Sequence, residues 1–358
     1  MIKNYNQTYC IYRKEIRYIY NYLFIFLCFS QFLRFSMMQQ QLFSQISLQL
    51  EASTSLIDIV AMVLDISYDA AHRRTSMKAK LSLEESVLLA RHFSISLDQM
   101  YTEQDPERVI VNKTASITSE AELHHYFESS YRSLAPLVAQ THSSITYSAK
   151  DIPLFYTLTG TLLAKFKIYV WLKLLHPRYS DIPFEGFHPG LDLLSSAKRL
   201  GTLYESVATT EIWDTTTINS TLKQIHFYHE AGLLSAADAK QVCWELRELL
   251  KKLHRKVADA KPGFTLYFNE LLLMNNNVLV TTPKEKMLYV PFTILSYFRT
   301  SDVLFCEQAL DYLNKQLQHS KLLNSAGEKE QRQFFNKLYA KIGALEQWID
   351  SKQLLDFN

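Results

Sequence analysis

The sequence predicts a mainly α protein, in which a small N-terminal domain of five helices precedes a larger helical domain with a β-hairpin or meander near residues 264–292. Two observations favour helices. The chain of 358 residues has only 8 glycines and 9 prolines, and turn-rich β architectures need more of both. Serine N-caps are followed by apolar residues at helical spacing at several points along the chain. With 47% apolar and 21% charged residues, the composition is globular.

Five short helices are expected between residues 38 and 101. Leu42, Ile46 and Leu50 recur at helical spacing and indicate the first helix. Serines mark the starts of the other four, at Ser55, Ser67, Ser82 and Ser96. A short connection around Ile66 joins the second helix to the third. This spacing is typical of a helix-turn-helix, although a plain helical bundle remains the alternative.

The third helix, expected from Tyr68 to about Thr75, presents polar side chains to solvent. Ala71 and Thr75 are its inward positions. The opposite face carries four candidates for contacts with DNA bases, namely Tyr68, Asp69, His72 and Arg73. In the major groove an arginine can bond guanine at two points, and polar side chains can bond other base edges. The pattern therefore predicts a recognition helix.

A second group of polar residues lies around this helix and fits contacts with phosphate oxygens: Ser67, Arg74, Lys78 and Lys80. From His72 to Lys80 the chain contains no acidic residue. Residues 37–101 as a whole nevertheless hold five Lys or Arg and seven Asp or Glu, a net charge of −2. The positive charge is therefore a focused patch, and an ordinary solvated basic face is the alternative.

The segment 63–98, VLDISYDAAHRRTSMKAKLSLEESVLLARHFSISLD, resembles the N-terminal, lambda-repressor-like DNA-binding domain of helix-turn-helix transcriptional-regulator-like proteins of Bacteroidota. The likeness continues in four later segments, 145–158, 211–233, 266–280 and 327–342. It thus covers most of the chain between residues 40 and 345. The resemblance implies sequence-specific DNA binding by the first domain, followed by an uncharacterised all-helical or α+β regulatory domain.

Carried onto this chain, the family pattern falls on Ser67, Asp69, Ala71, Arg73 and Arg74. The chain departs from the pattern at three positions. Asp65 and Met77 stand where these proteins commonly have glycine, and Thr75 replaces a larger aliphatic residue. These departures would loosen the turn and the anchoring of the helix, so weak affinity for DNA is expected.

Residues 102–118 carry Pro106 and mixed polar residues and are predicted to be a linker with room for one strand. Beyond it, helices are expected over 119–140, 158–175, 189–208, 215–231, 236–258, 301–319 and 327–350. Residues 143–156 are predicted to be extended. We expect 119–350 to form a regulatory and self-association domain, because its helices carry more apolar and aromatic surface than a thin bundle needs.

The first 36 residues have an unusual composition, with six Tyr and five Ile but no Ala, Gly, Pro, Val or Asp. Three interpretations stay open: translation that begins at Met37 or Met38, a membrane anchor over 19–35, and a secretory signal. We favour the internal start, because the missing residue types have GC-rich codons. No membrane contact is expected unless residues 1–36 are genuine.

Motifs for catalysis and for cofactor binding are weak in this sequence. The first glycine is Gly160, so no Gly-rich phosphate or dinucleotide loop precedes it. The four cysteines lack zinc or disulfide spacing, which fits a reducing cytoplasm. His226 and His229 could share a metal, but no third ligand with diagnostic spacing is visible. We therefore expect no enzyme activity, no metal site and no cofactor.

Two further segments have both a plain and a functional interpretation. The basic run 247–256 is either a solvated helix face, which we favour, or a second contact with nucleic acid. Glu211, Trp213 and Asp214 mark either the start of a helix, which we favour, or an interaction surface.

Together these patterns predict a cytoplasmic, sequence-specific DNA-binding transcriptional regulator with residues 68–75 as its recognition helix. The expected partners are double-stranded DNA, a second copy of the chain and an unidentified small-molecule or protein effector. A homodimer is expected because one helix-turn-helix covers only one half-site. The alternatives are a protein–protein interaction or scaffold module whose helix-turn-helix does not bind DNA, and a membrane-tethered regulator.

Overall fold

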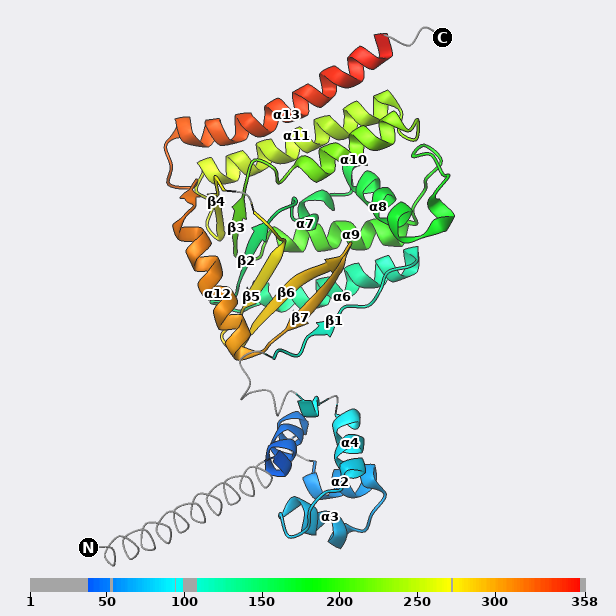
Figure 1. The fold of residues 1–358 in the computed structure, drawn as a ribbon, viewed down its shortest axis with the longest axis vertical. Helices are drawn as coiled ribbons and strands as arrows, with labels where there is room; N and C mark the ends of the chain where they lie inside the picture. The colour runs from blue at the N-terminus through cyan, green and yellow to red at the C-terminus, as the bar shows by residue number, and fades with distance from the viewer. Residues whose placement is uncertain (1–37, 52–53, 94, 99–107, 272, 355–358) are drawn as a thin grey trace, which may run out of the picture. The chain divides into compact units, whose positions relative to one another are not determined.

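A computed structural model describes residues 38–51, 54–93, 95–98, 108–271 and 273–354 (Figure 1). The chain divides into two compact units between Ile110 and Val111. This boundary falls inside the segment that the sequence predicts to be a linker. The three interpretations of residues 1–36 concern a part of the chain outside the described residues.

The N-terminal unit is helical throughout its described part. Its helices are residues 38–49, α2 (Leu56–Leu64), α3 (Tyr68–Thr75), α4 (Leu83–His92) and the residues 97–98. Their apolar faces meet in a small core that is formed by Leu42, Phe43, Ile46, Val60, Ala71 and Leu89. A connection of three residues joins α2 to α3, and the two helices pack against each other. This unit therefore contains a helix, a tight turn and a second helix in direct succession.

The second unit is built on a mixed sheet of eight strands. The strands are β1 (Asn112–Lys113), β2 (Ser144–Ala149), β3 (Thr209–Trp213), β4 (Phe264–Phe268), β5 (Asn277–Thr281), β6 (Lys286–Thr293), β7 (Ser296–Thr300) and β8 (Lys321–Leu322). Their order in the sheet is β1-β7-β6-β5-β2-β3-β4-β8. β2, β3 and β4 are parallel to one another, and the other neighbours pair antiparallel. Helical crossovers join the parallel strands, because such strands cannot be linked by a tight turn.

Helices cover both faces of this sheet. They are α6 (Glu120–Ala139), α7 (Leu154–Thr157), α8 (Leu162–Leu175), the short 3-10 helix η1 (Pro177–Tyr179), α9 (Leu191–Tyr204), α10 (Asn219–Glu230), α11 (Ala236–Ala258), α12 (Val303–Gln318) and α13 (Glu328–Leu354). The main core lies between one face and the helices α6 to α11 and α13. On the other face, α12 packs Cys306 and Leu313 against Leu279 and Leu288. Figure 1 shows α13 alongside α11.

Side chains of the central strands alternate between these two cores, as the period of a strand requires. In β2, Ile145 and Tyr147 belong to the main core. In β3, Trp213 belongs to the main core, whereas Ile212 belongs to the core under α12. Glu211 has the same parity as Trp213 and is completely buried, so a carboxylate lies within the main core.

The fold class predicted from the sequence, mainly α with a β-hairpin or meander near 264–292, is wrong for the second unit. Strands do occupy that range, but β4 and β5 are not neighbours, since β3 and β2 lie between them. β2 and β3 each stand alone between helices along the chain, so no hairpin signal announces them. Their pairing depends on residues far apart in the sequence.

Among the described residues, no helix combines the length and the apolar character that crossing a lipid bilayer requires. α8 is a strongly apolar helix, and it is a core helix of the second unit. Nine of its 14 residues are buried, and they include Phe166, Tyr169 and Trp171. Its apolar character is therefore explained by packing within the second unit.

Candidate nucleic-acid interface

The turn between α2 and α3 fixes where the third helix begins. Asp65 adopts a left-handed conformation with φ of 51°, and the Ile66 N–H donates to the Ala61 carbonyl at 3.0 Å. These features end α2 in the manner of a left-handed C-cap. The Ser67 hydroxyl then accepts a hydrogen bond from the Ala70 N–H at 3.3 Å and caps α3. The hydroxyl oxygen is the acceptor in that bond, so the Ser67 O–H remains available to donate a hydrogen bond to a DNA phosphate.

The four base-contact candidates share the outer face of α3. Tyr68 is 54% exposed, and Asp69, His72 and Arg73 are also exposed. Positions i, i+1, i+4 and i+5 fall on one side of a helix, which explains why they lie together. Arg73 can donate two bonds to a guanine and Asp69 can accept one from a cytosine. The face therefore offers donors, an acceptor and an aromatic ring within a helix of eight residues.

Arg74, which the sequence assigned to a phosphate contact, is held inside the unit. Its Nη2 and Nε atoms donate to the two carboxylate oxygens of Glu85 at 2.6 and 3.0 Å, and its Nη1 donates to the Ala70 carbonyl at 3.1 Å. The hydrogen bond from Arg74 keeps the pKa of the Glu85 carboxyl below its ordinary value. Because these bonds tie α3 to α4, the geometry favours a positioning role for Arg74 over a phosphate contact.

Gln39, which the sequence did not distinguish from its neighbours Gln40 and Gln41, fixes the other end of α3. Its Nε2 donates to the carbonyls of Arg74 and Ala79, both at 2.9 Å. Its Oε1 accepts from the Leu81 N–H at 3.1 Å. One amide thus satisfies three backbone groups around the segment that follows α3. No local signal marks this residue, since its partners lie 35 to 42 positions away.

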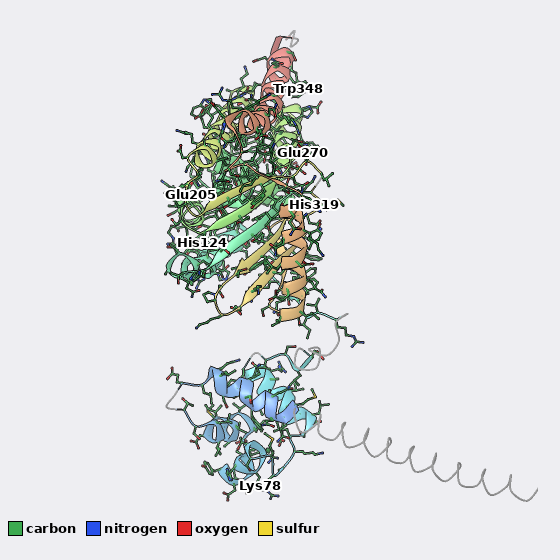
Figure 2. All side chains as sticks on the ribbon, turned by 90° about the vertical axis from the view of Figure 1, so that its left-hand side faces the viewer. Lys78, His124, Glu205, Glu270, His319 and Trp348 are labelled. Carbon is green, nitrogen blue, oxygen red and sulfur yellow. The ribbon has the colours of Figure 1, made fainter. Side chains whose placement is uncertain are left out.

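The segment held by Gln39 carries the two predicted lysine contacts to phosphate. Lys78 and Lys80 are both exposed, and Figure 2 shows Lys78 at the surface of this unit. Met77, which precedes them, has φ of 61°. Asp65 and Met77, which stand where the resembled family commonly has glycine, are thus both in the left-handed region. The backbone conformation is the one that glycine favours, adopted here by residues with side chains.

An apolar patch on α4 accompanies this polar face. Leu83 is 74% exposed, Val87 39% and Leu88 50%. Three exposed aliphatic side chains within two turns of one helix are unusual on a helix that faces only water. The N-terminal unit therefore has two different surfaces, a polar one on α3 and an apolar one on α4.

The histidine pair on α10 is used for packing. The rings of His226 and His229 contact the Trp348 ring at centroid distances of 4.1 and 5.8 Å, and His229 Nδ1 bonds the Leu234 carbonyl at 2.9 Å. Across the residues that the structure describes, no group of three or more His, Cys, Asp or Glu is arranged to hold a metal ion. These contacts give both rings a structural explanation.

The basic run 247–256 on α11 is largely engaged with acidic side chains. Arg247 pairs with Glu346 at 2.5 Å, and Lys252 pairs with Glu205 at 2.5 Å. Lys251 pairs with Glu248 one turn away at 2.7 Å. These ion pairs reduce the positive charge available for a second contact with nucleic acid.

Glu211, which was interpreted as part of a helix start or an interaction surface, lies instead in the buried strand β3. Its Oε1 accepts from the hydroxyls of Tyr156 and Tyr204 at 2.6 and 2.9 Å. Its Oε2 accepts from the Trp213 Nε1 at 2.8 Å. Burial raises the pKa of this carboxyl, and the three donors oppose that rise. The group is fully bonded, so it serves the core and not a surface.

No family model, curated protein or solved structure matches this chain. The resemblance to helix-turn-helix regulators therefore rests on the sequence alone, in residues 63–98 and in the four later segments.

Proposed function

We propose that the N-terminal unit binds double-stranded DNA, with α3 in the major groove, and that the chain is a transcriptional regulator. One observation carries this proposal. Four side chains that can hydrogen-bond to base edges lie on the exposed face of α3, and the opposite side of this helix is held by contacts within the unit. The buried Ala71, the bond between Arg74 and Glu85, and the Gln39 amide hold the helix in place. A helix anchored in this way presents its outer face with little freedom, as base recognition requires.

In this proposal the polar groups divide into two functions. Tyr68, Asp69, His72 and Arg73 contact bases, and Ser67, Lys78 and Lys80 contact phosphates. Arg74 holds the helix. The net charge of −2 over residues 37–101 limits the nonspecific attraction to DNA, so sequence readout must supply a larger share of the affinity.

The test is selection of bound duplexes from a random pool by the full chain, followed by fluorescence polarisation. We expect Arg73→Gln to lower discrimination between selected and scrambled duplexes about tenfold, because a bidentate contact contributes about 1–3 kcal/mol. Lys78→Gln should weaken binding to both duplexes alike, and it should reduce the slope of log affinity against log salt concentration by about one. Arg91→Gln, on α4, is the control of equal charge and should leave discrimination intact. A pool that yields no preferred sequence would contradict the proposal.

A second candidate function is protein binding through the N-terminal unit. The exposed Leu83, Val87 and Leu88 on α4 favour it, as does the negative net charge of residues 37–101. In that case Leu88→Lys would abolish complex formation, and Arg73→Gln would not. Binding driven by apolar burial also depends little on salt, whereas binding to phosphates decreases steeply as salt rises.

A homodimer, an effector and a location in the cytoplasm, where such a regulator meets its DNA, belong to the same proposal. The aromatic residues that suggested self-association are mostly used elsewhere, because Tyr156, Phe166, Tyr169 and Trp171 lie in the main core. The argument that remains is geometric, since one helix-turn-helix covers one half-site. Light scattering on the full chain, with and without the selected duplex, tests whether two copies bind together.

A further inference from the structure

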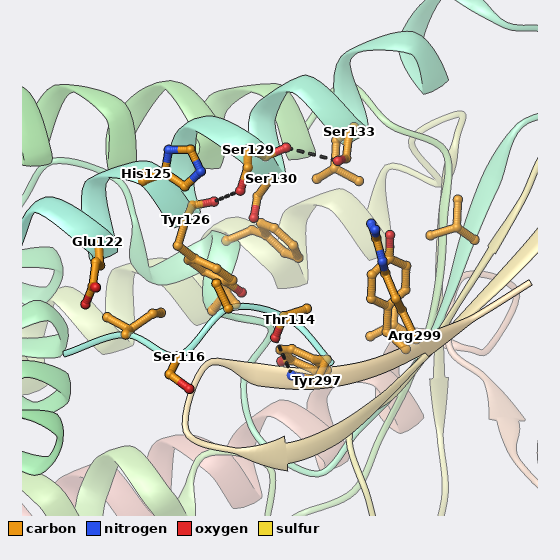
Figure 3. A pocket seen from close by; sticks show the side chains of 18 of the residues that line it. Thr114, Ser116, Glu122, His125, Tyr126, Ser129, Ser130, Ser133, Tyr297 and Arg299 are labelled. Atoms are coloured by element: carbon orange, nitrogen blue, oxygen red, sulfur yellow. Dashed lines mark hydrogen bonds between the residues drawn. The ribbon is translucent and has the colours of Figure 1, made fainter. Parts of the chain in front are cut away.

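A cavity of about 470 Å³ lies between α6 and the sheet in the second unit (Figure 3). Strands β2, β5, β6 and β7 contribute to one wall, and residues 114–117 close one side. On the opposite wall, α6 contributes Ser129, Ser130 and Ser133. These three side chains are short, so they leave space between the helix and the strands. The volume falls within the range of about 300–1,000 Å³ that is typical of small-molecule sites.

The cavity exposes more apolar than polar surface, although many of its lining residues have a polar group. Ile117, Leu134, Ile145 and Val280 supply aliphatic surface. Tyrosine hydroxyls come from four different elements, at Tyr126, Tyr147, Tyr289 and Tyr297. Burial raises the pKa of each of these tyrosines and so favours the neutral hydroxyl. A cavity with this lining suits a ligand with an apolar body and one polar end.

Arg299 supplies the cationic group of this cavity. It lies on β7, opposite Tyr289 of β6, and bonds the Tyr289 hydroxyl. Within the described part of the chain, no Asp or Glu forms an ion pair with it. Glu122 also lines the cavity, but its Oε2 accepts from the Thr118 N–H and hydroxyl at 2.6 and 2.7 Å. Figure 3 shows Glu122 and Arg299 at opposite ends of the cavity.

We propose that this cavity binds a small organic monocarboxylate, with its carboxylate on Arg299 and its apolar body against Leu134, Ile145 and Val280. Arg299 is exposed, so its guanidinium lies where the cavity meets solvent, and it can bond a carboxylate while the apolar body of the ligand lies against the walls. A phosphate ester fits less well, because phosphate sites gather several donors with positive charge or helix N-termini. A cationic ligand would be repelled by Arg299. This binding does not depend on DNA binding by the other unit, so either proposal can fail alone.

The experiment is isothermal titration calorimetry of the full chain with 2-naphthoate and with its neutral isostere 2-naphthamide. Wild type should bind the carboxylate about tenfold or more tightly than the amide, as a charge-assisted bond allows. Arg299→Gln should remove that preference and leave amide binding within about twofold. Arg332→Gln is the control of equal charge, since Arg332 is exposed on α13 and pairs with Glu328 one turn away. It should bind both probes as wild type does.

Ser130→Phe locates the site, because a phenyl ring on α6 would occupy the space that serine leaves. Both probes should lose binding in this variant, while thermal unfolding reports whether it is folded. Equal binding of the two probes by wild type would overturn the proposal, and so would an unchanged preference in Arg299→Gln. Absence of binding of both probes at about millimolar concentration, by calorimetry at two temperatures, would overturn it as well.

Discussion

The Arg74 guanidinium on α3 holds the Glu85 carboxylate on α4 through two hydrogen bonds, of 2.6 and 3.0 Å. The same carboxylate accepts from the Ser82 N–H at 3.0 Å and completes the capping box of α4. One acidic side chain thus starts α4 and fixes α3 on it. Its neighbour in sequence, Arg73, is exposed on the outer face of α3. Two adjacent arginines therefore have different roles, and they can be separated by experiment.

Arg74→Ala should destabilise the N-terminal unit, whereas Arg73→Ala should not. The ion pair is largely shielded, with side-chain exposures of 22% and 19%, so its loss should cost about 1–3 kcal/mol. Arg73→Ala should change stability by less than about 0.5 kcal/mol. Urea denaturation of a fragment spanning 38–110 measures both, since its core contains only residues of this unit. If Arg74→Ala weakens DNA binding at unchanged stability, the phosphate contact predicted from the sequence is correct.

Acid should weaken the same pair. Arg74 lowers the pKa of Glu85 relative to the unfolded chain, where a glutamate titrates near about 4.3. A carboxyl with a lowered folded pKa adds stability above its unfolded pKa, and this contribution is lost as pH falls through the folded pKa. The difference in unfolding free energy between wild type and Glu85→Gln should therefore be largest at pH 7 and should decrease as the pH falls below about 4.3. A difference that stays constant down to about pH 3 would contradict this linkage.

Met77→Gly should stabilise the N-terminal unit. Met77 has φ of 61°, a conformation that costs a residue with a Cβ about 1–2 kcal/mol. Glycine removes this strain but adds entropy to the unfolded chain, so a net gain of about 0.5–1 kcal/mol is expected. Asp65→Gly, at φ of 51°, should gain less because aspartate tolerates this region. As a control, Met62→Gly within α2 should lower the free energy of unfolding by about 1 kcal/mol in the same urea denaturation.

Glu211→Ala should severely destabilise the second unit, because it leaves three buried donors without an acceptor. Each orphaned donor costs about 1–3 kcal/mol, so the total should exceed about 3 kcal/mol. Glu211→Gln should be milder, because its amide oxygen can still accept from Tyr156 and Tyr204. Thermal unfolding of the full chain, monitored by circular dichroism, compares the two Glu211 variants. The control Glu328→Gln, on an exposed pair with Arg332, should show no measurable change, and equal effects of the two Glu211 variants would refute this account.

Local patterns in the sequence determined most of the helices. Ser67 caps α3 and Ala71 is its buried residue, as the spacing indicated. The helix expected over 236–258 is α11, Ala236–Ala258. Such features depend on residues three or four positions apart, and these interactions are visible in any short window of the chain. Even here the structure differs at one point, because Ser55 begins α2 without a side-chain capping bond.

Only the tertiary structure decided the sheet, the cavity and the roles of the charged side chains. β2 pairs with β3 and β5, which lie on either side of it in space but follow it at distant positions in the chain. A strand of five residues such as Thr209–Trp213 carries no sign of its partners, because hydrogen bonds between strands join backbone groups that every residue except proline possesses. For the same reason the sequence could not show that Arg74 meets Glu85 while Arg299 meets no carboxylate among the described residues. The sequence shows which residues are charged, but the fold determines which of these charges are paired.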